Sequence, residues 1–193
     1  MTREQQKRNK ELKKQIEASS KANYKDYNLK KKDYMFYIVR DKMIYMMMFF
    51  MTDGKLLTSF YAKPFWADDL LWDILDMGSN KQEPVSLRAI GAFTIQSKIH
   101  ETQQTISSIG EVEGLVNNGF AEFVAFSNDY SEENFLDAYP QILYQQDVLR
   151  IIVLIHKGQY DEALNLLKVK NIRDFGSNNK CFSELAIEYL KSR

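Results

Sequence analysis

The sequence predicts an α+β protein, in which a four-stranded, mainly antiparallel sheet packs with helices and an all-helical C-terminal portion follows. Three observations predict this class. Short runs rich in aromatic and branched residues follow one another between residues 33 and 63, with turn signals between them. A helix-forming segment precedes these runs, and apolar residues at helical spacing dominate the second half of the chain.

The basic N-terminal segment, residues 1–32, is expected to be a helix from residue 2 to 22, with Thr2 as its cap. It contains eleven Lys and Arg and four Asp and Glu, so it carries +7 while the rest of the chain carries −7. One interpretation is an arm that binds nucleic acid, anionic lipid or an acidic partner. The favoured one is a solvated helix that packs on its own acidic body or on that of a neighbouring molecule. Only Leu12 and Ile16 form an apolar stripe, so we expect fraying unless a partner or the body holds it.

The sheet is expected within residues 33–105. The three strands of an antiparallel meander are predicted at residues 33–40, 43–51 and 56–63. A polar break at residues 40–42 suits a tight connection, and Asp53-Gly54 favours a hairpin turn with positive φ.

A helix is predicted at residues 65–77, with Asp68 and Asp69 in its first turn, where negative charge favours the positive end of the helix dipole. Residues 86–100 alternate in a way that predicts a fourth strand returning to the sheet.

The C-terminal region, residues 106–193, is expected to be helical and to pack on the sheet. Residues 108–126 have apolar side chains near helical spacing, but Asn118-Gly119 is also a hairpin signal. We favour the helix, because a hairpin would need a sheet edge that the sequence does not provide. After a polar connection at residues 129–140, the remaining predicted helices are residues 141–156, 159–170 and 181–191.

The segment Gly158-Gln159-Tyr160-Asp161-Glu162-Ala163-Leu164 resembles the opening of a tetratricopeptide-type helix. Only one copy is present, whereas an array needs about three units to be stable. We therefore expect an isolated helical hairpin, in which the small Ala163 lets two helices approach closely.

Three further segments, at residues 61–64, 69–75 and 86–93, are similar to a bacterial family of unknown function. The family is a small α+β domain with an N-terminal helix and a meander, and the similarity covers roughly residues 5–130. The resemblance implies a fold and transfers no activity.

The composition is that of a globular protein, with 193 residues of which 45% are hydrophobic and 27% charged. These values exclude collagen-like, low-complexity and wholly disordered classes. The single cysteine, Cys181, excludes an intramolecular disulfide, and two histidines, His100 and His156, are too few for a multi-histidine metal site. We expect no metal and no cofactor.

Catalytic motifs are missing from the sequence: it has no glycine-rich phosphate loop, no Gly-x-Ser-x-Gly and no His-Glu-x-x-His. Cys181 with His156 or His100 would make a thiol nucleophile and its base, although a packing role for Cys181 is favoured. His100 with nearby glutamates would make a weak oxygen-rich metal site, although a solvated loop explains the same residues. These glutamates are Glu101, Glu111 and Glu113.

Five residues are candidates for binding a partner: Lys30, Lys31, Lys32, Trp66 and Arg88. The lysines would contact phosphates while nearby tyrosines stack on bases. These tyrosines are Tyr24, Tyr27 and Tyr34. Trp66 is either a hydrophobic staple for the following helix, which is favoured, or an exposed anchor. Arg88 either pairs with Asp68 or Asp69, which is favoured, or offers its planar fork to a ligand carboxylate or phosphate.

The function predicted from these features is a non-enzymatic, cytoplasmic protein that binds another protein or a second copy of itself. The alternative is nucleic-acid binding by the basic arm, and the third hypothesis is an enzyme with a site near His100 or Arg88. A membrane is not expected, because residues 1–14 are too polar for a secretory signal. The longest apolar run, residues 43–51, is also far shorter than the roughly 20 residues that cross a bilayer.

Overall fold

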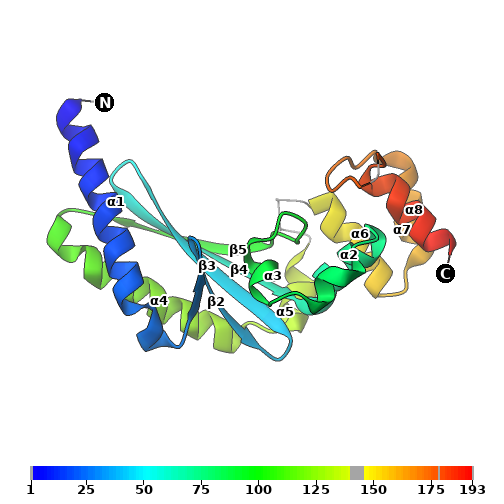
Figure 1. Cartoon of the computed structure of the whole chain (residues 1–193), viewed down its shortest axis with the longest axis horizontal. Coiled ribbons are helices and arrows are strands. Elements are labelled where there is room, and N and C mark those ends of the chain that lie inside the picture. The colour runs from blue at the N-terminus through cyan, green and yellow to red at the C-terminus, as the bar shows by residue number, and fades with distance from the viewer. Residues whose placement is uncertain (1, 140–145, 178, 193) are drawn as a thin grey trace. The chain divides into compact units, whose positions relative to one another are not determined.

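The computed structural model describes residues 2–139, 146–177 and 179–192 (Figure 1). Within these ranges the chain forms eight α-helices and one antiparallel sheet, which confirms the α+β class. The chain divides into two compact units. Unit 1 comprises Met1–Asp41, Tyr45–Ala62 and Lys98–Ser131, and unit 2 comprises Lys42–Ile44, Lys63–Ser97 and Glu132–Arg193.

The sheet has five strands rather than the predicted four, in the order β1-β2-β3-β4-β5. The strands are β1 (Lys30–Lys32), β2 (Met35–Arg40), β3 (Met43–Thr52), β4 (Lys55–Pro64) and β5 (Lys98–Thr105). The prediction missed β1 because three successive lysines show no alternation of apolar and polar residues. The strand forms through its pairing with β2, in which Lys31 lies opposite Phe36.

The two hairpins on either side of β3 match the prediction. Asp41 and Lys42 have φ of 46° and 62°, and Asp53 and Gly54 have φ of 48° and 73°. Two-residue loops with both φ values positive suit the right-handed twist of the flanking strands. They also set the register, with the residues that flank each loop directly opposite one another.

The predicted strand at residues 86–100 is wrong for most of its length. Ser86–Ile90 forms the short helix α3, and β5 begins only at Lys98. The intervening segment is irregular because a buried ion pair uses its backbone: the Ile95 N–H donates to the Asp68 carboxylate, and the Ile95 carbonyl accepts from Lys63. These bonds take the place of a strand ladder.

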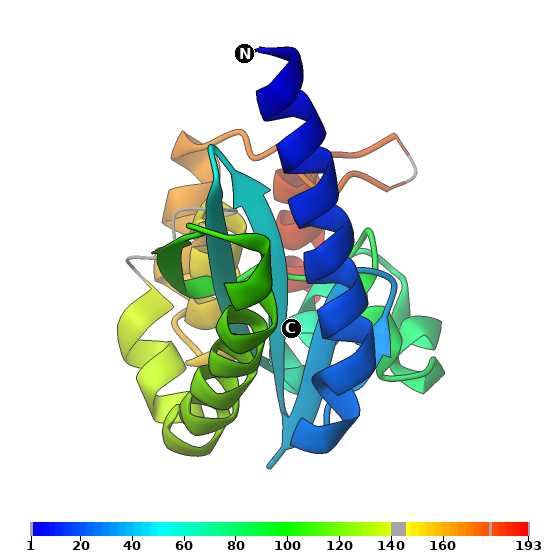
Figure 2. The same ribbon diagram turned by 90° about the vertical axis from the view of Figure 1, so that its left-hand side faces the viewer.

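Helix α1 (Arg3–Asn23) packs on the rest of unit 1 rather than extending as a free arm. Thr2 caps it, as predicted, and Leu12 and Ile16 are buried. Arg8 donates to the backbone carbonyl of Ser107 over 2.9 Å, and α1 packs along α4 (Figure 2). The body therefore provides the support that the short apolar stripe of α1 requires.

Helix α4 (Val112–Asp129) confirms the helical interpretation of residues 108–126. Its Phe120 ring packs edge-on against Phe36 and Phe49, with centroid distances of 5.1 and 5.2 Å. A Cβ at Gly119 would lie 2.7 Å from the Phe49 ring. Gly119 thus allows α4 to approach the sheet closely and makes no turn.

Unit 2 consists mainly of helices. They are α2 (Phe65–Ile74), α3, α5 (Glu132–Ala138), α6 (Gln146–His156), α7 (Tyr160–Val169) and α8 (Phe182–Lys191). Short 3-10 turns, η1 (Tyr24–Tyr27) and η3 (Ile109–Glu111) in unit 1 and η2 (Gly78–Gln82) in unit 2, complete the structure. The predicted helices at 65–77, 159–170 and 181–191 are confirmed, and that at 141–156 is confirmed from residue 146. Its first part lies outside the described residues.

The turn between α6 and α7 also agrees with the sequence. Gly158 has φ of 72° and ends α6, and the fully buried Ala163 lies in α7, which packs against α6. In the part of the chain that the structure describes, no helix combines the length and apolar character needed to span a membrane.

Candidate functional site

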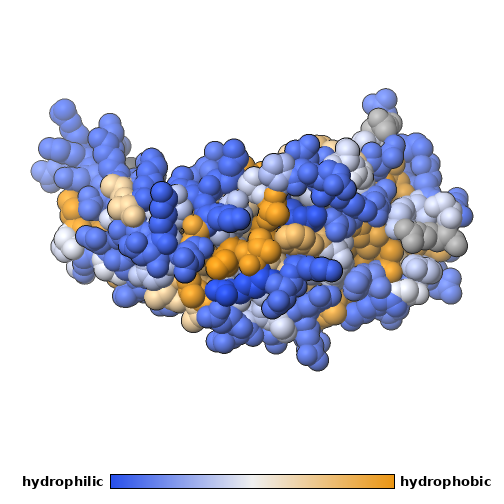
Figure 3. Space-filling model, turned by 60° about the horizontal axis from the view of Figure 1, so that its bottom comes forward, coloured by the Kyte–Doolittle hydropathy of each residue, from blue (hydrophilic) through white to orange (hydrophobic). Residues whose placement is uncertain are grey.

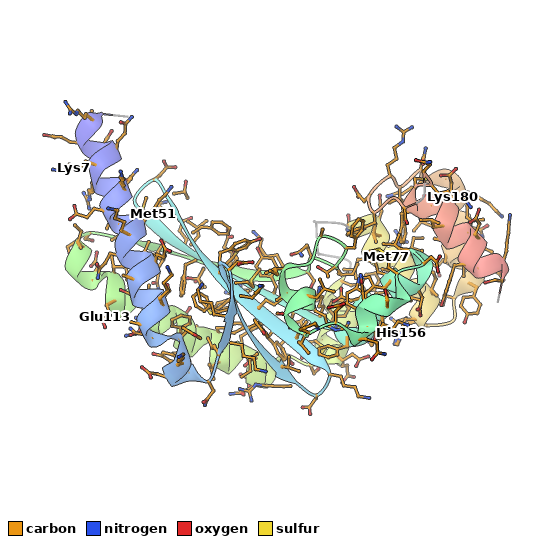
Figure 4. All side chains as sticks on the ribbon, viewed as in Figure 1. Lys7, Met51, Met77, Glu113, His156 and Lys180 are labelled. Atoms are coloured by element: carbon orange, nitrogen blue, oxygen red, sulfur yellow. The ribbon has the colours of Figure 1, made fainter. Side chains whose placement is uncertain are left out.

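A groove of about 530 Å³ lies in unit 1 between α1 and the end of β3. Residues of α1 form one wall, and the turn between β1 and β2 together with β2 and β3 forms the rest. The lining residues are Lys13, Ile16, Glu17, Ser20, Lys21, Lys31, Asp33, Tyr34, Phe36, Phe49, Phe50 and Met51. Figure 4 shows Met51 near the β3–β4 hairpin, beside α1.

Strand lengths explain why the groove exists. The loop at residues 41–42 places Arg40 opposite Met43, so the first residue of β2, Met35, lies opposite Met48. The last four residues of β3 therefore extend past β2. We call these residues, 49–52, the overhang. No described strand continues β2 along this edge, since β1 lies on the far side of β2.

The floor of the groove is apolar and its rim is exposed. Ile16 and Phe36 are buried, and Phe49 and Met51 are half-buried. At the rim, Phe50 is 48% exposed and Tyr34 is 65% exposed. Figure 3 shows that the end of unit 1 that holds α1 is mostly hydrophilic on the face in view.

The charged residues of the groove are three lysines and two carboxylates. Lys21 pairs with Glu17 at 2.6 Å, and this hydrogen bond and its positive charge hold the pKa of the Glu17 carboxyl below its ordinary value of 4.5. Lys31 donates to the Asp33 carbonyl and lies 5.9 Å from the centre of the Phe36 ring. Lys13 makes no ion pair with another described residue, so its positive charge is available to a ligand.

The predicted lysine cluster lies at this site only in part. Lys31 lines the groove, while Lys30 and Lys32 are exposed on the edge strand β1. The tyrosines expected to stack on bases differ in their exposure to solvent. Tyr34 is exposed, but the other two pack internally, with ring centroids 5.7 Å apart for Tyr24–Phe36 and 5.3 Å apart for Tyr27–Phe120.

Arg88 lies inside unit 2, on α3. Its Nη2 donates to Asp69 Oδ1 over 2.6 Å, its Nη1 donates to the Phe65 carbonyl, and its guanidinium carbon lies 4.7 Å from the Trp72 ring centre. The favoured interpretation, pairing within the protein, is confirmed for Asp69. A ligand would have to displace these contacts to bind the Arg88 guanidinium group.

The structure adds two residues that the sequence analysis did not single out as a pair, Lys63 and Asp68. Both side chains are fully buried, and Lys63 Nζ donates to Asp68 Oδ1 over 3.0 Å. Burial raises the pKa of the Asp68 carboxyl and lowers the pKa of the Lys63 amine, and each partner's charge opposes the shift of the other. The sequence offers one weak signal for this lysine, its position before Pro64 at the end of a predicted strand.

Asp68 also receives a hydrogen bond from the Ile95 N–H at 2.8 Å, and its Oδ2 lies 3.7 Å from Arg88 Nη1. Lys63 donates its second hydrogen bond to the Ile95 carbonyl. The cluster of Lys63, Asp68, Asp69 and Arg88 is thus balanced in charge and ties three segments of unit 2 together.

Trp66 lies in a half-buried cluster of unit 2. Its ring stacks on His156 with centroids 3.7 Å apart and planes 5° apart, and its Nε1 donates to Glu132 Oε1 over 2.6 Å. Figure 4 labels His156 on the helical part of the structure. Burial lowers the pKa of the His156 imidazole below 6.5, opposed by the Glu132 carboxylate.

The residues considered for catalysis, His100 and Cys181, have separate structural surroundings. His100 is exposed on β5, with its ring centre 5.8 Å from that of Phe60. Cys181 caps the start of α8, where its backbone N–H donates to Glu184 and lowers the pKa of that carboxyl. Among the described residues, no group of three or more His, Cys, Asp and Glu is arranged to hold a metal ion.

Comparisons with known proteins do not assign the chain to a family. The chain matches no family model, and no curated protein and no solved structure is significantly similar to it. The resemblance of three segments to a bacterial family therefore stays a prediction.

Proposed function

We propose that the chain is a cytosolic, non-enzymatic protein-binding module that holds a short segment of another protein in the groove of unit 1. The observation that carries this proposal is the exposure of Phe50 and Tyr34, which line a groove whose other apolar side chains are buried or half-buried. Aromatic residues and methionine are enriched where proteins bind one another, and an aromatic ring in a groove is a typical anchor.

The size of the groove supports a short peptide. Pockets that enclose drug-sized ligands measure about 300 to 1,000 Å³, and this groove, at about 530 Å³, falls in that range. It is large enough for a few side chains of a partner and too small for a folded domain. We therefore expect the partner to contribute a segment rather than a surface.

Nucleic-acid binding is the second candidate, favoured by the exposed Lys30 and Lys32 beside the exposed Tyr34. The exposure of the tyrosines argues against it. Tyr34 alone of the three tyrosines expected to stack on bases is exposed, while Tyr24 and Tyr27 pack on phenylalanine rings of unit 1. An enzyme site near His100 or Arg88 is less favoured still, because the Arg88 fork is occupied by Asp69 and Phe65.

Affinity capture with matched variants tests the proposal. Full-length protein, Phe50→Asp and Val169→Asp would be incubated with extract of the source cells, with and without nuclease. Val169 is the control because it is 85% exposed and belongs to unit 2. We expect the same protein to be retained after nuclease by wild type and Val169→Asp and lost with Phe50→Asp.

Retention of nucleic acid alone would support the second candidate instead. Point variants are preferable to deletion of residues 1–32, because that deletion removes the buried Leu12 and Ile16 together with one wall of the groove.

A further inference from the structure

We infer that the segment held in the groove is an extended, acidic peptide that adds to the overhang of β3 as an extra strand. This inference rests on the proposed function and specifies the chemistry and conformation of the partner. The first observation that supports it concerns the backbone N–H and C=O groups of β3.

The register of the two hairpins fixes which backbone groups of the overhang are available. In a two-residue hairpin, the residues that flank the loop exchange hydrogen bonds, and every second residue then does the same. Thr52 and Phe50 therefore turn their backbone groups toward β4, while Met51 turns its N–H and C=O toward the side of β2. Because β2 begins opposite Met48, Met51 has no strand partner there among the described residues.

An extended peptide is the occupant that satisfies these groups. In β-strand addition, main-chain hydrogen bonds supply affinity, and pockets for alternate side chains supply specificity. A helix laid in the same groove would cover the Met51 N–H and C=O without pairing them, and a buried backbone group that lacks a hydrogen bond destabilises the complex. The unpaired edge therefore favours a strand over a helix.

The side chains of the groove predict the sequence pattern of the peptide. On the face of the sheet that carries α1, an added strand meets Ile16, Phe36 and Met51, so apolar residues are favoured at every second position. The α1 wall also presents Lys13, whose charge has no partner among the described residues, and Lys31 lies on the opposite wall. Acidic residues that flank the apolar positions complement these charges.

Selection from a library of random octapeptides, displayed on phage and presented to the full chain, tests this inference. We expect enriched peptides to alternate apolar residues with Asp or Glu. The most enriched peptide, made with a fluorophore, would then be titrated into the protein and its fluorescence anisotropy measured.

Variants of the overhang separate backbone pairing from side-chain contact. Met51→Pro removes the outward N–H while leaving the ladder to β4 in place, and it should weaken binding of the selected peptide by about tenfold, the effect of one hydrogen bond of about 1.4 kcal/mol. Met51→Ala, which removes most of the side chain but keeps the N–H, is the control and should bind more tightly than Met51→Pro. Circular dichroism of each variant checks that it is folded.

Charge variants of α1 test the acidic character. Lys13→Glu should weaken binding several-fold, more at low salt than at high salt. Lys7→Glu is the matched control on the same helix, since Lys7 lies toward the N-terminal end of α1, outside the groove lining (Figure 4). Equal weakening by the two variants would overturn the claim that Lys13 contacts the peptide.

The outcomes distinguish this inference from the proposed function. Enriched peptides with apolar residues at helical spacing, whose binding is lost with Phe50→Asp, would keep the groove as a protein-binding site and overturn strand addition. Unchanged binding by folded Met51→Pro would do the same. Enrichment of no peptide, or binding insensitive to Phe50→Asp, would overturn both.

Discussion

Replacing Asp68 by Asn should destabilise unit 2 strongly, because it leaves a buried ammonium without a counter-charge. The Lys63 and Asp68 side chains are both 0% exposed and 3.0 Å apart. Removing one partner of a buried ion pair costs about 3–5 kcal/mol, since the other charge remains desolvated. Asn is the mildest replacement, because its carbonyl oxygen can still accept the hydrogen bond from the Ile95 N–H.

The double variant Lys63→Met, Asp68→Asn makes the prediction specific. It removes both charges, and Arg88 keeps its partner Asp69 at 2.6 Å. Replacing a buried pair by neutral residues of similar volume is often nearly neutral in stability. We therefore expect the double variant to be more stable than Asp68→Asn alone, with a clearly non-additive double-mutant cycle.

Urea unfolding followed by tryptophan fluorescence is the assay. Both tryptophans, Trp66 and Trp72, belong to unit 2, and Trp72 Nε1 donates to the Phe93 carbonyl, so their emission reports on the unit that carries the ion pair. A loss below about 1 kcal/mol for Asp68→Asn, or a double variant that loses the sum of the two single losses, would show that the pair is not buried as described.

Three further predictions concern single positions. Leu12→Ala should lower the free energy of unfolding by about 2–5 kcal/mol in urea denaturation, because Leu12 is fully buried, while the exposed Lys14→Ala changes little. Gly119→Ala should destabilise by about 1–3 kcal/mol despite the better helix propensity of Ala, since its Cβ would meet the Phe49 ring at 2.7 Å; greater stability in denaturation would contradict this close approach. Because the pKa of folded His156 is lowered, the unfolded chain binds more protons below pH 6.5; stability measured from pH 7 to 5 should fall as the pH drops through this range, and His156→Gln should flatten the slope.

The parts of the fold that the sequence predicts are those specified locally. Asp53-Gly54 encodes a turn in two residues, Thr2 encodes a helix cap, and Gly158 ends a helix with its positive φ. Such signals act within a few residues of the chain, so they can be recognised without knowing what packs around them.

The errors arise where a distant residue decides the local structure. β1 consists of lysines and becomes a strand only by pairing with β2. The alternating pattern after residue 90 suggests a strand, but hydrogen bonds from Ile95 to Lys63 and Asp68 hold that segment in an irregular path. Gly119 illustrates the same point, since a hairpin signal in the sequence is a close helix–sheet contact in the structure.

The candidate site was predictable in part. The basic character of residues 1–32 drew attention to the region in which the groove lies, and Lys31 lines the groove. The groove itself depends on a difference in length between β2 and β3 and on the packing of α1, which bring together residues far apart in the chain. Phe50 looked like one apolar residue among nine in a row, and only the structure shows that it is exposed.

Photo-crosslinking in living cells tests the groove most directly as a protein-binding site. The photoreactive residue benzoylphenylalanine would replace Phe50 in the full chain, and Val169 in a matched control, since both side chains are exposed. A groove that binds a segment of another protein predicts an adduct from position 50 that contains a second protein, resists nuclease and is missing from position 169. No protein adduct at position 50, or one that nuclease removes, would contradict it.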